Sequence, residues 1–183
     1  MLWLGASLKN YSTVDDLILL SKELIDFIFK EKNPDLSSDK IETITYEEFV
    51  YPFRDSDNSY NQAKANMRKP LIIYKLPIST NSISQRLGDN TSDEFKLIIG
   101  GYTIVHGYSE LNDPLELRNR LYEQGYFKEE GDLEELLKDM EKGCPPASSM
   151  GLSLDRLSML FCKSKNIKEV IAFPFSRLEK QNE

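Results

Sequence analysis

Residues 95–105 read Phe-Lys-Leu-Ile-Ile-Gly-Gly-Tyr-Thr-Ile-Val, and this stretch predicts a β-hairpin. Two largely apolar runs, 95–99 and 102–105, flank the pair Gly100-Gly101. Such a pair is favoured in a two-residue hairpin turn because both central residues then take a positive φ, which glycine adopts at little cost. The hairpin makes antiparallel strands the starting point for the fold.

The same turn predicts a register for the two strands. With two residues in the turn, residue 98 faces residue 103 and residue 96 faces residue 105. Side chains at every second position of a strand share a face. Lys96 and Thr103 are therefore expected on one face of the hairpin.

Strands and helices alternate irregularly on either side of the hairpin. Ser12 or Thr13 can cap a helix that ends near Lys30, and Asp113-Pro114 can start another that runs to Gly125. Further helices are expected at 133–142 and from Asp155, with strands at 1–6, 41–46, 70–74, 150–154 and 170–175 and polar loops at 33–35, 51–68 and 76–90. Because the order lacks regular βαβ alternation, we predict a single α+β domain, residues 1–183, on a largely antiparallel sheet.

The composition is typical of one globular domain, with 183 residues, 40% hydrophobic and 29% charged. There are 23 Lys and Arg against 30 Asp and Glu, and the formal charge of −7 disfavours a general binder of nucleic acid or membrane surfaces. No apolar run approaches the ~20 residues that span a bilayer, so no membrane association is expected. Cys144 and Cys162 form no C-x-x-C pair and His106 is the only histidine, which favours a reducing, cytoplasmic compartment and disfavours a zinc site.

Three stretches carry side chains suited to ligand binding: residues 106–113, 143–157 and 169–175. Glu110 could hold an ammonium group where a strand ends. Gly151 and Ser153 keep a strand narrow enough for a flat ring to approach. Arg156, just inside a helix N-terminus, offers a fork of donors that suits a phosphate. Each feature also has a plainer explanation, since small residues often serve tight packing and an Asp-Arg pair at a helix start is usually a cap with a surface charge.

Taken together and in order, these stretches resemble the C-terminal half of a class II aminoacyl-tRNA synthetase catalytic domain, and within that family lysyl-tRNA synthetase and the elongation factor P lysine ligase. The motifs are Phe-x-Leu-x-Ile-Gly-Gly, Gly-Tyr-Ser-Glu-Leu-Asn-Asp-Pro, Gly-x-Pro-Pro and Asp-Arg-Leu-x-Met-Leu. The closing segment Val-Ile-Ala-Phe-Pro-Phe, residues 170–175, is more similar to the elongation factor P ligase. The resemblance extends over about residues 1–177 and implies a six- or seven-stranded antiparallel sheet flanked by helices.

The resemblance implies an ATP site and a lysine site. Arg156 matches the arginine of motif 3 that contacts ATP, and Gly151 matches the first glycine of that motif, whereas Ser153 replaces the second. Tyr108 and Glu110 match residues that hold the substrate lysine. His106 replaces an asparagine of that lysine site, and an ordinary hydrogen bond within the strand is an equally good explanation for it.

The hairpin departs from the family pattern at the metal ligands. The family places two glutamates where this chain has Lys96 and Thr103, and those glutamates hold the magnesium ions that bridge the ATP phosphates. Magnesium prefers anionic oxygen ligands, and a lysine repels it. We therefore expect the magnesium site to be lost and metal-assisted adenylate formation to be impaired. Lys96 could instead touch a phosphate directly.

The resemblance also implies missing parts. Motif 1, most of motif 2 and any anticodon-binding domain are not recognised, and residues 1–4 match only the second strand of motif 2. We expect a truncated, degenerate lysyl-tRNA synthetase-like pseudoenzyme that retains lysine or ATP binding and does not charge tRNA alone. Two alternatives remain open. One is half of a split lysine ligase, acting on tRNA or elongation factor P, whose partner chain supplies motifs 1 and 2; the other is an interaction module without a ligand.

Overall fold

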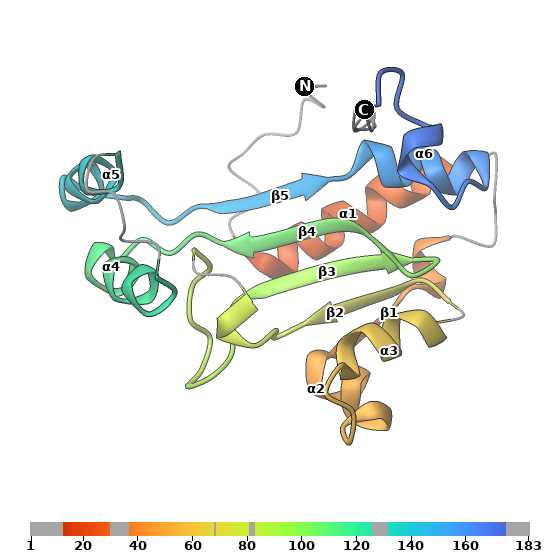
Figure 1. The fold of residues 1–183 in the computed structure, drawn as a ribbon. Coiled ribbons are helices and arrows are strands. Elements are labelled where there is room, and N and C mark those ends of the chain that lie inside the picture. Colours follow the sequence, from red (N-terminus) through yellow and green to blue (C-terminus); the bar gives the residue numbers. More distant parts are fainter. Residues whose placement is uncertain (1–12, 30–36, 68, 81–82, 126–131, 175–183) are drawn as a thin grey trace, which may run out of the picture.

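The computed structural model describes residues 13–29, 37–67, 69–80, 83–125 and 132–174, and their strands form one five-stranded sheet (Figure 1). The strands lie side by side in chain order: β1 (Glu42–Thr45), β2 (Leu71–Tyr74), β3 (Glu94–Ile99), β4 (Tyr102–Ser109) and β5 (Ser148–Leu152). The first pair is parallel and the other three are antiparallel. The predicted α+β fold on a largely antiparallel sheet is confirmed, although the described sheet has five strands and one parallel pair.

The central hairpin forms as the sequence predicts. Gly100 and Gly101 have φ values of 59° and 79°, which a two-residue turn of this kind requires. Ile98 pairs with Thr103, as expected. The expected pairing of residue 96 with residue 105 is wrong, because the register shifts between Leu97 and Ile98 and places Lys96 opposite His106.

The register shift is a β-bulge with a physical cause in the core. Leu97 pairs with Val105 and Ile98 with Thr103, so Ile104 has no partner of its own. Ile104 and Val105 are both buried, at 1% and 0% exposure, in the same hydrophobic cluster. Regular alternation would direct one of these neighbours to the opposite face. The bulge allows Ile104 and Val105 to be buried together. As a consequence, His106 lies opposite Lys96.

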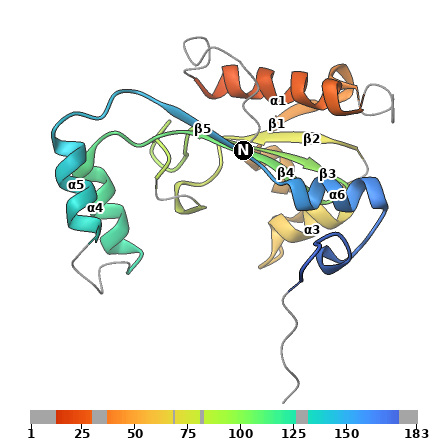
Figure 2. The same ribbon diagram turned by 90° about the horizontal axis from the view of Figure 1, so that it is seen from above.

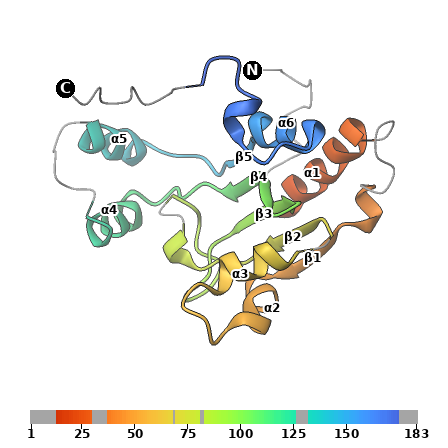
Figure 3. The ribbon, with the colours of Figure 1, turned by 45° about the vertical axis from the view of Figure 1, so that its right-hand side comes forward.

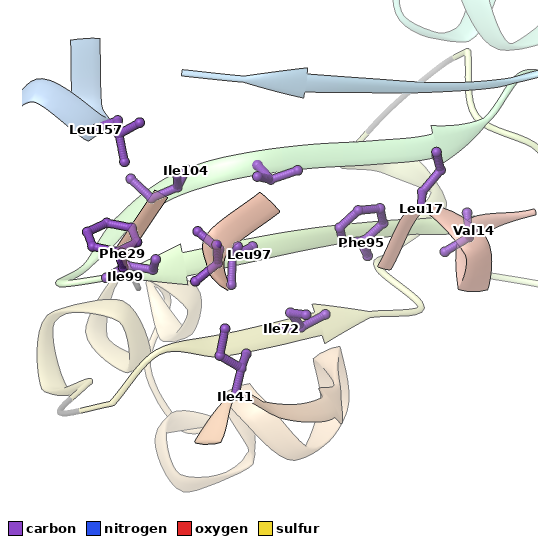
Figure 4. Close-up of a cluster of buried hydrophobic side chains, with 12 residues drawn as sticks. Val14, Leu17, Phe29, Ile41, Ile72, Phe95, Leu97, Ile99, Ile104 and Leu157 are labelled. Carbon is purple, nitrogen blue, oxygen red and sulfur yellow. The ribbon is translucent and has the colours of Figure 1, made fainter. Parts of the chain in front are cut away.

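Helices cover both faces of the sheet (Figure 2). Of the two predicted caps, Ser12 lies outside the described residues, and the Thr13 hydroxyl oxygen accepts from the Asp16 amide at 3.2 Å. The helix that Thr13 caps, α1 (Val14–Phe29), lies on one face. Its apolar stripe packs on the odd-numbered side chains of β3 in the main core cluster (Figure 4), whose buried members are Val14, Leu17, Ile25, Phe29, Ile41, Ile72, Phe95, Leu97, Ile99, Ile104, Val105 and Leu157.

The opposite face carries α2 (Tyr46–Val50) and α3 (Ser59–Asn66). They form a second cluster in which Phe49 and Ala63 pack against Ile73 and Ile98 of the sheet. The prediction of a polar surface loop at 51–68 is wrong for residues 51–53 and 59–66. A 3₁₀ turn and α3 form there, because one apolar stripe of a mostly polar segment is sufficient to anchor it on the sheet.

Three further helices lie at the ends of the sheet. The pair α4 (Pro114–Glu123) and α5 (Asp132–Glu141) packs together beyond one end, and α6 (Leu154–Cys162) follows β5 at the other (Figures 1 and 3). All three were predicted within a few residues. The strand predicted at 170–175 is wrong for residues 170–174, which are irregular and follow a 3₁₀ turn. The strand at 1–6 and the turn at 33–35 lie outside the described residues. None of the described helices is long and apolar enough to cross a bilayer.

Candidate functional site

Polar side chains gather on one face of β3, β4 and β5, the face that also carries α2 and α3. Residues opposite one another in antiparallel strands share a face. The pairings of Glu94 with Tyr108, Lys96 with His106 and Ile98 with Thr103 therefore define one set. Ser149 of β5 joins it because it pairs with Tyr108. We call this surface the polar face; its side chains are those of Glu94, Lys96, Thr103, His106, Tyr108 and Ser149.

Glu94 is the centre of an ion network on the polar face. Its side chain is fully buried, and its Oε1 lies 2.7 Å from Nε2 of His106 and 3.1 Å from Nζ of Lys96. Ser92 donates its hydroxyl to Oε2 of Glu94 at 3.1 Å. Burial opposes ionisation, but the hydrogen bond with His106 and the charge of Lys96 outweigh it, and the pKa of Glu94 lies below its ordinary value. His106 thus makes a hydrogen bond within the protein, the plainer explanation considered for it.

One end of the polar face is acidic. Glu110 follows β4 directly, and its Oε1 accepts a hydrogen bond from the Ser149 hydroxyl. Its Oε2 and the hydroxyl of Tyr108 have no hydrogen-bond partner within the described part of the chain. Burial raises the pKa of Tyr108, and the charges of Glu110 and Glu94 raise it further, so the phenol stays protonated and can donate. This end offers a carboxylate oxygen and a hydroxyl to a cationic group.

The other end of the polar face lies next to the hairpin turn and carries Arg156. The first turn of α6 presents this residue, and its Nη1 donates to the Thr103 carbonyl oxygen at 2.8 Å. Ser153 is the N-cap of α6, and its hydroxyl accepts from the Arg156 amide at 3.4 Å. Ser153 therefore has a structural role at the position where the resemblance implies an ATP contact.

Sequence reasoning missed two residues at this end, Tyr60 and Lys64 of α3. The Tyr60 side chain lies close to that of Thr103, and Lys64 follows one helical turn later, with its Nζ 5.7 Å from the Tyr60 ring centroid. Burial lowers the pKa of Lys64, and the nearby charges of Arg156 and Lys96 lower it further. No local pattern could have predicted this approach, because it depends on where α3 packs on the sheet.

Glu94 and Ser149 were also missed, for different reasons. Glu94 precedes Lys96 by two residues, so strand alternation alone places it on the same face and could have revealed it. Ser149 has no such signal, because only the pairing of β5 with β4 brings it to Tyr108 and Glu110.

Two glycines near His106 have different roles. A Cβ on Gly107 would lie 2.4 Å from Cε1 of Phe95, so this glycine makes room for a buried ring on the α1 side. A Cβ on Gly151 would meet only the His106 carbonyl oxygen, at 3.9 Å. The surface above Gly151 is therefore open, as a site for a flat ligand requires.

The residues present do not suit the magnesium ion that the resemblance implies. Lys96 brings a positive charge to the face, and the Thr103 side chain is a neutral hydroxyl that supplies no anionic oxygen. The carboxylate of Glu94 is buried and already holds Lys96, His106 and Ser92. Within the described ranges, no group of three or more His, Cys, Asp or Glu side chains is arranged to hold a metal ion.

Comparison with known proteins assigns the fold to a family. The family model described as tRNA synthetases class II (D, K and N) matches residues 8–177. Among solved structures, the asparaginyl-tRNA synthetase of Pyrococcus horikoshii superposes with a TM-score of 0.72 at 18% identity, over 92% of this chain and 48% of that one. At this identity the likeness concerns the fold.

Curated relatives include lysine–tRNA ligases. That of Acinetobacter baumannii is 33% identical over 172 residues, which is 90% of this chain and 31% of the ligase. That of Helicobacter hepaticus is 30% identical over 222 aligned positions, covering 94% of this chain and 43% of the ligase. The chain therefore spans 31% to 43% of the length of these relatives.

Proposed function

The chain belongs to the class II tRNA synthetase family of the D, K and N type, and from this premise we propose that its polar face binds lysine and an adenine nucleotide without supporting metal-assisted adenylation on its own. The observation that carries the lysine part is that Glu110 Oε2 and the Tyr108 hydroxyl have no hydrogen-bond partner among the described residues and lie beside the buried charge of Glu94. A primary ammonium has three donors and a positive charge, which this acidic end complements.

The nucleotide part rests on the opposite end of the face. Arg156 has donors beyond the one given to Thr103, and Gly151 leaves the strand surface open beside it. A lysine whose ammonium lies at Glu110 would extend its carboxylate along β4 towards these groups. The relative positions of the acidic and basic ends thus support one ligand pair on one face.

Low ligase activity follows from the residues at the metal positions. Lys96 and Thr103 supply no carboxylate for magnesium, and losing one electrostatic contact to a transition state typically costs ~10²–10³ in rate. We therefore propose a synthetase-like binding protein, in effect a pseudoenzyme. With a formal charge of −7, it is not expected to hold tRNA unaided. The proposal includes a cytoplasmic location, because Cys144 and Cys162 are both free thiols.

Thermal-shift titration tests the lysine site. L-lysine should raise the melting temperature of the full chain in a concentration-dependent manner, whereas L-norleucine, which lacks the side-chain ammonium, should not. Glu110→Gln should remove the shift, and Glu135→Gln, an exposed glutamate on α5, should keep it. Equal shifts with norleucine, or an unchanged response in Glu110→Gln, would contradict the proposal. Lysine-dependent ATP–pyrophosphate exchange at the rate of an ordinary synthetase would contradict its low-activity part.

A second candidate is one part of a complete lysine ligase, acting on tRNA or elongation factor P, whose other part supplies motifs 1 and 2. The observation that favours it is length, since the region shared with this chain makes up only 31% and 43% of the two matched lysine–tRNA ligases. Co-expression with a segment carrying motifs 1 and 2 should then restore lysine-dependent exchange. Lys96 counts against this candidate, because a partner does not remove its charge from the face.

A further inference from the structure

We propose that Lys64, Lys96 and Arg156 form one anion site that holds a short linear polyphosphate, such as the triphosphate of a nucleotide, directly and without a magnesium ion. The inference rests on the proposed nucleotide binding and deepens it, by assigning the phosphate contacts to three cations from three separate elements.

The three cations come from elements that meet around Thr103. Arg156 donates to the Thr103 carbonyl oxygen at 2.8 Å, and Lys96 shares the strand face on which the Thr103 side chain lies. The end of α3 that carries Lys64 packs against the turn, because a Cβ on Gly101 would lie 3.5 Å from the Lys64 carbonyl oxygen. Tyr60, one turn earlier, contacts the Thr103 side chain. The cations thus border one small region from the sheet, from α3 and from α6.

Their charges are poorly compensated. Neither Lys64 nor Arg156 belongs to an ion pair within the described part of the chain, and Lys96 shares Glu94 with His106. Among the described residues, Glu94 is the one carboxylate that forms an ion pair with any of the three cations, although the formal charge of the chain is −7. Burial lowers the pKa of Lys64, and repulsion from Arg156 and Lys96 lowers it further. A bound polyanion would relieve this repulsion, which is a source of binding free energy.

The chemistry of the cations suits phosphate oxygens. A guanidinium offers a planar fork of donors, and each ammonium is a compact charge with three donors. In solution, magnesium neutralises much of the charge of a triphosphate. The cation cluster and the magnesium ion therefore compete for the same phosphate oxygens. Metal-free ATP is expected to bind more tightly than its magnesium complex.

Isothermal titration calorimetry on the full chain tests this. ATP and inorganic tripolyphosphate should both bind in EDTA, with affinity falling several-fold in excess magnesium, and adenosine should bind more weakly than ATP. Lys64→Ala and Lys96→Ala should each weaken ATP binding by roughly fivefold or more, while Lys64→Arg should retain it. Lys142→Ala, which removes an equal charge from an exposed position just after α5, is the matched control and should have no effect.

The outcomes separate this inference from the function on which it rests. If ATP binds only with magnesium, or if Lys64→Ala and Lys96→Ala with native melting curves bind as well as wild type, the polyphosphate site is wrong and nucleotide binding stands. If neither ATP nor tripolyphosphate binds under either condition, the site and the nucleotide part of the function are both wrong, while the lysine titration still tests the lysine part. Tripolyphosphate binding as tight as ATP, with no competition by adenosine, would support the site and identify free polyphosphate as its ligand.

Discussion

Glu94 of β3 and His106 of β4 are diagonal neighbours on one face of the sheet, with Oε1 of the buried carboxylate 2.7 Å from Nε2 of the imidazole. Lys96 reaches the same oxygen from the neighbouring position on β3. This arrangement exists because the β-bulge moves His106 opposite Lys96. The two ion pairs join Glu94, Lys96 and His106, which lie between the acidic and basic ends of the polar face.

The Glu94 network should make stability sensitive to acid. The pKa of Glu94 is lowered in the folded chain, so its contribution is present above the ordinary value of 4.5 and declines as pH falls from there through the folded pKa. Glu94→Gln should lower the free energy of unfolding at pH 7 by about 1–3 kcal/mol and flatten the dependence on pH below 4.5. Urea denaturation at several pH values measures both, with Glu135→Gln as an exposed control. An unchanged slope in Glu94→Gln would contradict the assignment.

Gly107→Ala should destabilise the fold. The added methyl would lie 2.4 Å from a ring carbon of the fully buried Phe95, and overpacking of this kind costs about 1–3 kcal/mol. Gly151→Ala is the matched control on the next strand, where the Cβ has space, and should change stability by less than about 0.5 kcal/mol. Adding Phe95→Leu to Gly107→Ala should recover part of the loss. Equal melting temperatures for the two glycine variants would rule out the steric explanation.

Asp113 should stabilise α4 as its N-cap. Its Oδ1 accepts from the amides of Leu115 at 2.8 Å and Glu116 at 3.2 Å. Asp113→Ala should therefore cost about 1 kcal/mol, whereas Asp113→Asn, which keeps a capping oxygen, should cost much less. Chemical denaturation of the two variants separates a capping role from a role in ligand binding. Loss of lysine binding without loss of stability would favour the latter.

Arg156 should matter for binding more than for folding. Its side chain is exposed, and one neutral hydrogen-bond acceptor, the Thr103 carbonyl oxygen, holds it. Arg156→Ala should change the free energy of unfolding by less than about 1 kcal/mol, since solvent replaces that contact. The affinity for ATP should fall by roughly tenfold, because a charge-assisted contact is lost. A large drop in stability together with unchanged ATP affinity would identify Arg156 as a structural residue only.

Several elements could be predicted because their signals are local. The Gly-Gly turn requires positive φ at both positions, and the Asp-Pro pair starts α4 with a cap and a preset φ. The strand at 170–175 was predicted from composition alone, and residues 170–174 remain irregular because no described strand pairs with them. The segment 51–68 has too few apolar residues to signal a helix, and the contact of Ala63 and Tyr60 with the sheet supplies what the local pattern lacks.

The sequence by itself determined the hairpin, the family motifs and the shared face of Lys96 and Thr103, because each follows from neighbouring residues and the two-residue period of a strand. Only the tertiary structure decided the bulge that pairs Lys96 with His106, the burial of Glu94 and the approach of Lys64 to Arg156. The reason is that the bulge follows from packing Ile104 and Val105 against α1. The charge environment of Glu94 and Lys64 likewise depends on burial and on residues far away in the chain.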